Sequence, residues 1–173
     1  MFESLFDTIF GLPVHPLVVH ATEVVVPTAA LVVVVAAVWP RFRRWAKFLP
    51  LLLALAAAVL VPLSTQSGEA LQERVPESTL VETHVNLAEG LLPWVLGLVV
   101  VAAVLLWWNY REMSGRASAA RAPKWVAIVL AAAALVAATG TTVQAVLIGH
   151  SGATSVWSEV GGAPAPVGGE DDD

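Results

Sequence analysis

The chain has 173 residues, of which 57% are hydrophobic and only 13% are charged. This composition lies outside the range of water-soluble domains. The absence of cysteine excludes disulfides, thiolate metal sites and covalently attached c-type haem. The net charge is -5, but the signs are segregated, because all but one of the nine basic residues fall in two short segments.

Four long apolar blocks predict a membrane protein with four spans. A bilayer core of roughly 30 Å needs about 20 helical residues. The first, third and fourth blocks reach that length alone, and the second reaches it with its flanking residues. The first block follows an acidic segment without a cleavage site, so we expect no cleavable signal peptide. We expect an all-α fold, a four-helix transmembrane bundle over residues 1–157, and a flexible acidic tail over 158–173. The expected spans are 16–38, 45–66, 87–108 and 125–149.

The basic residues predict how the chain is oriented. They lie between the first and second spans and between the third and fourth, and short basic loops stay in the cytoplasm. We therefore expect a multi-pass protein of the bacterial inner membrane with its N- and C-termini outside. The residues concerned are Arg41, Arg43, Arg44, Lys47, Arg111, Arg116, Arg121 and Lys124.

All four histidines lie at the expected outer end of the bundle. His20 and Glu23 lie inside the first span and share one helical face. A lipid-facing charge there would cost several kcal/mol, so we expect Glu23 to point into the bundle. We expect His20, His84 and His150 to reach the same depth from three spans, whereas His15 lies at the wet interface.

The two halves of the chain resemble each other, which predicts a duplicated helical hairpin. Residues 15–39 align with residues 84–108 without a gap, and both segments start with histidine and end with tryptophan. The motif "TQSGEA" after the second span aligns with "IGHSGA" after the fourth, so that Gln66 matches His150. Two parallel repeats would be related by an axis along the membrane normal, and their equivalent polar positions would converge.

Four motifs carry a family resemblance: "GLPVHPLVVH", "TQSGEA", "ETHVN" and "IGHSGATSVW". They resemble domain-of-unknown-function family 2231, a group of uncharacterised bacterial four-span membrane proteins. The resemblance covers nearly all of residues 11–157. It implies a four-helix membrane domain whose matching histidines are His15, His20, His84 and His150, and it implies no established activity.

Two kinds of bound group are compatible with the histidines. The first hypothesis is one haem b near the outer surface, with axial ligands drawn from His20, His84 and His150. The second is a transition-metal site, because neutral imidazole suits zinc, copper and iron alike. The metal ligands would come from His15, His20, Glu23, His84 and His150.

The competing hypothesis is a structural or assembly subunit without a cofactor, in which the histidines cap helices at the interface. The sequence contains no nucleophile placed beside a base and no phosphate-binding loop, so enzyme activity is not supported. The expected surroundings are the lipid bilayer and respiratory or redox membrane proteins, with no nucleic acid. A transporter is disfavoured because no ionisable group continues a pathway through the cytoplasmic half.

Overall fold

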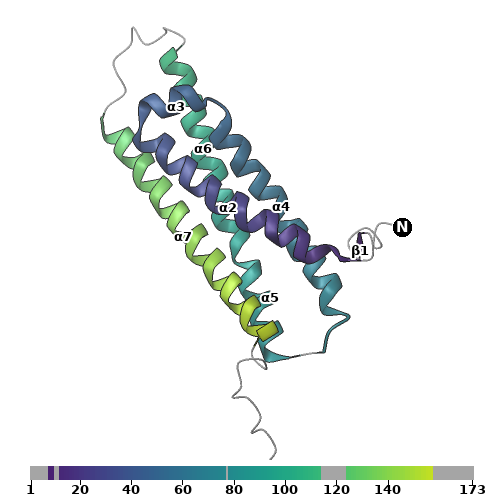
Figure 1. The fold of residues 1–173 in the computed structure, drawn as a ribbon. Helices are drawn as coiled ribbons and strands as arrows, with labels where there is room; N and C mark the ends of the chain where they lie inside the picture. The colour runs from purple at the N-terminus through teal and green to yellow at the C-terminus, as the bar shows by residue number, and fades with distance from the viewer. Residues whose placement is uncertain (1–7, 10–11, 77, 114–123, 158–173) are drawn as a thin grey trace, which may run out of the picture.

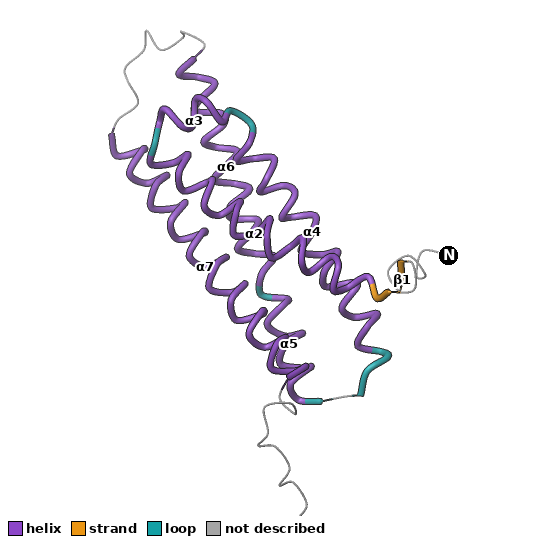
Figure 2. Tube along the Cα trace, viewed as in Figure 1, coloured by secondary structure: helices purple, strands orange, loops and turns teal. Residues whose placement is uncertain are grey.

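The computed structural model describes residues 8–9, 12–76, 78–113 and 124–157. Within these ranges the chain is almost entirely helical, and four of its helical segments are long and apolar enough to cross a membrane (Figure 2). This confirms the predicted four-span, all-α architecture. The tail 158–173 lies outside the described residues, as do Arg116 and Arg121. The elements are β1 (Thr8–Ile9), β2 (Leu12–Pro13), α2 (Val14–Val38), α3 (Pro40–Ala46), α4 (Leu49–Gln72), α5 (Thr79–Glu89), α6 (Leu91–Met113) and α7 (Lys124–Trp157).

The helices extend beyond the apolar blocks that predicted them. The second and fourth expected spans ended at residues 66 and 149, whereas α4 continues to Gln72 and α7 to Trp157. Helical hydrogen bonds do not require a lipid environment, so hydrophobicity marks only the membrane-embedded part of a helix. The third span is preceded by a separate helix, because the chain breaks at Gly90 between α5 and α6. The side chain of Ser78 begins α5 by accepting a hydrogen bond from the Val81 amide at 3.2 Å.

The four spans form a ring in which neighbours in space are not always neighbours in sequence. Helix α2 packs against α4 and α7, and α6 packs between the same two helices on the opposite side (Figure 1). Helix α3 lies at one end of the bundle and α5 at the other. We call these the basic end, which carries Arg41, Arg43, Arg44, Lys47, Arg111 and Lys124, and the histidine end, which carries His15 and His84.

The packing supports the predicted duplication. In the register that places His15 on His84, buried positions of α2 coincide with buried positions of α6. The register that places Gly68 on Gly152 does the same for α4 and α7. Two related hairpins therefore form the core about a pseudo-twofold axis. The matched positions are Thr22 with Leu91, Val26 with Val95, Ala29 with Leu98, Val33 with Ala102, Ala36 with Leu105, Pro50 with Ala134, Ala54 with Ala138 and Ala57 with Thr141.

At the basic end the two halves are joined by an ion pair between equivalent positions. Arg43 and Glu112 match each other in the same register, and the Arg43 Nη2 atom lies 3.3 Å from Glu112 Oε2. The guanidinium is buried and also donates to the Ala36 carbonyl, near the end of α2, at 3.3 Å. This contact fixes α3 against α6.

Candidate functional site

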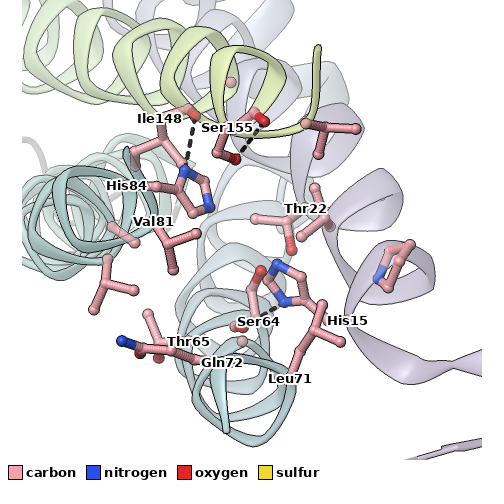
Figure 3. A pocket seen from close by; sticks show the side chains of 18 of the residues that line it. His15, Thr22, Ser64, Thr65, Leu71, Gln72, Val81, His84, Ile148 and Ser155 are labelled. Carbon is pink, nitrogen blue, oxygen red and sulfur yellow. Dashed lines mark hydrogen bonds between the residues drawn. The ribbon is translucent and has the colours of Figure 1, made fainter. Parts of the chain in front are cut away.

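A cleft of about 940 Å³ opens at the histidine end of the bundle. Its walls come from α2, α4, α5 and α7, with Leu91 of α6 closing the inner side. Most of the lining is apolar, and the polar groups that project into it include the imidazoles of His15 and His84 (Figure 3). A mostly apolar cleft with a few convergent polar groups is the usual form of a small-molecule or cofactor site.

His15, in the first turn of α2, is held by the second helix of its own repeat. Its Nδ1 atom lies 3.1 Å from the Ser64 carbonyl oxygen and 3.2 Å from Ser67 Oγ. The Ser67 hydroxyl donates its own hydrogen to the Ser64 carbonyl at 3.0 Å. A carbonyl can only accept, so Nδ1 carries the proton, and Nε2 of the neutral ring keeps its lone pair.

His84, on α5, makes the same contacts in the second repeat. Its Nδ1 atom lies 3.1 Å from the Ile148 carbonyl oxygen and 3.0 Å from Ser151 Oγ. The Ser151 hydroxyl donates to the Ile148 carbonyl at 2.9 Å. The tautomer is therefore the same as that of His15, with the proton on Nδ1 and the lone pair on Nε2.

A glycine beneath each ring makes these contacts sterically possible. A Cβ atom on Gly68 would lie 3.0 Å from Cε1 of His15, and one on Gly152 would lie 3.1 Å from Cε1 of His84. Each ring thus rests against the backbone of the helix that binds it. The pair Ser67-Gly68 and its counterpart Ser151-Gly152 form one imidazole cradle in each repeat.

The two cradles aim the imidazoles at each other. In Figure 3 the nitrogen of each ring that makes no hydrogen bond to its cradle is directed into the cleft, towards the other ring. No described residue hydrogen-bonds to Nε2 of His15 or His84. The cleft thus presents two Nε2 lone pairs related by the pseudo-twofold axis.

The other predicted site residues are arranged differently. His20 is exposed at the edge of the cleft, where its Nδ1 donates to the Pro16 carbonyl of its own helix. Glu23 is also an exposed lining residue, and it lies beside Gly149 of α7. His150 is exposed and does not line the cleft.

The expected convergence of His20, His84 and His150 is therefore not found in the structure. Helix α7 turns Gly152 towards the cleft, and a helix rotates by about 100° per residue, which directs His150 elsewhere. Among the described residues, no three or more His, Asp or Glu side chains are grouped closely enough to hold a metal ion. The five residues expected as metal ligands are thus not gathered, and only His15 and His84 face each other.

Residues 11–164 match the protein-family model described as "Predicted membrane protein (DUF2231)". The chain belongs to the DUF2231 family. No curated protein and no solved structure matches it significantly. The resemblance inferred from the motifs is thereby confirmed.

In this DUF2231 chain, the sequence placed His15 at the wet interface and left it out of the expected haem ligands, although His15 was among the expected metal ligands. The repeat alignment contained the information, because it matched His15 with His84 and Ser67-Gly68 with Ser151-Gly152. Equivalent residues on either side of a pseudo-twofold axis meet when they lie close to that axis. The sequence does not reveal which positions do so.

Proposed function

We propose that this DUF2231 protein holds one haem b between His15 and His84 and acts as a redox or accessory subunit at the outer face of the bacterial inner membrane. The observation that carries the proposal is the pair of Nε2 lone pairs facing each other across the cleft.

A ligand that binds both nitrogens would suit two imidazoles directed at each other. Two protonated rings would repel, and two neutral rings of the same tautomer leave both lone pairs without a donor. A metal centre bound to both nitrogens removes this conflict. Both repeats also carry the same Ser-Gly cradle, as expected if the two rings do the same work.

The cradles supply the outer-shell contact that metal-bound histidine normally has. A ligating imidazole almost always donates its other N–H to a carbonyl or carboxylate, which fixes the ring and raises its basicity. Here the Ser64 and Ile148 carbonyls accept from Nδ1 of His15 and His84, respectively. Both rings are thus prepared to bind through Nε2.

The number of ligands favours haem iron over a bare metal ion. Zinc sites use three or four protein ligands, and the described residues offer no group of that size. A porphyrin brings four nitrogens of its own, so His15 and His84 would be enough to hold its iron. The cleft, at about 940 Å³, is at the upper end of the range for small-molecule pockets and is largely apolar.

The charge pattern supports placing this site outside. The basic end carries nearly all the positive charge of the described chain, and such loops stay in the cytoplasm. The histidine end would then face the periplasm or cell exterior with one redox centre. Because no second histidine pair lies towards the basic end, electrons would be exchanged with a partner on the outer side, such as a respiratory or redox membrane protein.

The test is an absorption spectrum and a metal analysis of the protein purified in detergent, with haem b offered on reconstitution. We expect a Soret band with the split visible bands of bis-imidazole haem. The band should be lost, or changed to that of a five-coordinate haem, in His15→Ala and in His84→Ala.

The matched controls are His20→Ala and His150→Ala, which remove exposed histidines from the same end of the bundle. Both controls should retain the spectrum. Loss of the band in the controls but not in His15→Ala would instead indicate that the ligands are among His20, His84 and His150, as expected from the sequence. A preparation that takes up neither haem nor a stoichiometric metal would leave the structural or assembly role.

A further inference from the structure

The short helix α3 has two chemically different faces. Phe42 packs against the core of the bundle, and the neighbouring Arg43 is buried in its ion pair with Glu112. The opposite side of the helix carries Arg41 and Arg44, which are both exposed. These two residues are three positions apart and so share one helical face.

Three exposed cations in and directly after α3 have no counter-ion among the described residues. Lys47 directly follows α3, three residues after Arg44, and is also exposed. Within the described part of the chain, none of the three has an ion pair or a hydrogen bond from its side chain. By contrast, the guanidinium of Arg43 donates hydrogen bonds to the Ala36 carbonyl and to Glu112. Arg43 thus stabilises the fold, whereas Arg41 and Arg44 of α3 and the following Lys47 are available to a partner.

Aromatic rings flank the free cations and form a groove. A hollow of about 240 Å³ is lined by Trp39, Arg41, Phe42 and Trp45. The ring centroids of Trp39 and Phe42 are 6.3 Å apart, and those of Phe42 and Trp45 are 5.8 Å apart. Tryptophan settles at the depth of lipid headgroups, where one side of the ring is apolar and the other is wet. The groove therefore combines a cation with surfaces suited to the first carbons of an acyl chain.

The backbone at Lys47 is strained in a way that glycine would relieve. Lys47 has φ 46° and ψ -101°, and it has the only positive φ found at a described non-glycine residue. A residue with a Cβ atom pays a steric penalty there that glycine does not. Glycine would fit best at this position of the turn, yet the chain has a lysine there. We infer that the ammonium group of Lys47 contributes something other than stability.

We propose that the outer face of α3 is a binding site for the phosphate headgroup of an anionic phospholipid. Arg41, Arg44 and Lys47 surround the phosphate, and the groove between Trp39 and Trp45 accepts the adjoining glycerol and upper acyl chain. Basic residues directly beside a membrane span attract anionic headgroups, and the effect corresponds to about fivefold in affinity for each cation. This site is independent of the histidine cleft at the other end of the bundle.

The experiment is a lipid titration of the intact protein in neutral detergent, followed by native mass spectrometry. Phosphatidylglycerol and phosphatidylcholine are compared as probes, with inorganic phosphate as a third arm. We expect phosphatidylglycerol to bind at least tenfold more tightly than phosphatidylcholine. Arg41→Gln and Arg44→Gln should each weaken it about fivefold. Arg74→Gln, which removes one cation from the opposite end, should leave it unchanged.

Lys47→Gly separates lipid binding from folding. The substitution should lower the affinity for phosphatidylglycerol about fivefold. It should keep or raise the midpoint of thermal unfolding, because the backbone strain is removed. A merely structural lysine would move the midpoint without changing lipid affinity. The proposal is overturned if the two lipids bind equally, if Lys47→Gly retains full affinity, or if inorganic phosphate binds as tightly as phosphatidylglycerol.

Discussion

At the residue scale, the site depends on small groups that bring each imidazole against a helix. A serine hydroxyl and a carbonyl fix the tautomer of His15, and Gly68 allows the ring to reach them. The second repeat reproduces this arrangement with Ser151 and Gly152 around His84. The chemistry of the cleft therefore rests as much on two Ser-Gly pairs as on the histidines themselves.

Gly68→Ala and Gly152→Ala should each displace the ring that rests on the glycine. The added Cβ would lie 3.0 Å from Cε1 of His15 or 3.1 Å from Cε1 of His84, which is tighter than an ordinary van der Waals contact. We expect the unfolding free energy in detergent to fall by about 1–3 kcal/mol and haem uptake to fall with it.

Gly97→Ala is the matched control for these two variants. The new Cβ would meet Cβ of Ala137 at 3.7 Å, an ordinary van der Waals contact. Stability should stay the same or rise slightly, because alanine is the better helix former. Equal losses in all three variants would show that the cradles have no special role.

At the element scale, the distinctive feature is the break that separates α5 from α6. Gln144 of α7 donates from Nε2 to the Leu87 carbonyl at 2.6 Å, close to the end of α5. A Cβ on Gly90 would lie only 2.7 Å from that nitrogen. The glycine thus makes room for the amide that holds α5, and α5 carries His84. In the first repeat the corresponding part of α2 is continuous, so the two histidines meet from helices of different construction.

Gln144→Leu should loosen α5 without disturbing the spans. Hydrogen bonds between membrane helices contribute about 0.6–2 kcal/mol, and the loss should appear as faster amide hydrogen exchange in α5 and around Gly90. Gln66→Leu is the control, because Gln66 is exposed and has no side-chain hydrogen bond within the described residues. Unchanged exchange in Gln144→Leu would mean that packing alone holds α5.

At the scale of the whole molecule, the two repeats differ at one end of the bundle and agree at the other. The histidine end keeps the same residue in both repeats, whereas the basic end pairs Arg43 with Glu112. Opposite charges can satisfy each other directly across an axis. Two neutral imidazoles of the same tautomer do not, which agrees with the bound group proposed for the histidine end.

Arg43→Met should destabilise the pairing of the two halves. It removes the contacts to Glu112 and to the Ala36 carbonyl, so we expect a loss of about 1–3 kcal/mol in unfolding free energy. Arg44→Met removes an exposed cation of the same helix and should have no measurable effect in lipid-free detergent. Chemical denaturation in mixed micelles would compare the two variants, and equal stability would contradict the assigned role of Arg43.

The orientation of the molecule can be tested directly because the chain has no cysteine. Glu73→Cys places a thiol at the histidine end and Arg44→Cys places one at the basic end. If the positive-inside rule holds, a membrane-impermeant maleimide should label only Glu73→Cys in intact spheroplasts and both variants after lysis. Labelling of Arg44→Cys in intact spheroplasts would invert the topology.

The sequence by itself determined the membrane class, the number of spans and the family, and it predicted the duplication. Each of these follows from runs of apolar residues or from motifs that the chain carries in order, such as the two Ser-Gly pairs. Only the tertiary structure decided that His15 and His84 face each other while His20 and His150 are exposed. The physical reason is that lipid is as apolar as the interior of the bundle, so all faces of a span are hydrophobic and periodicity does not show which face is buried. The rotation of each helix is set by packing against its neighbours. Which histidine of "GLPVHPLVVH" faces the cleft therefore depends on how α2 packs against α4 and α7.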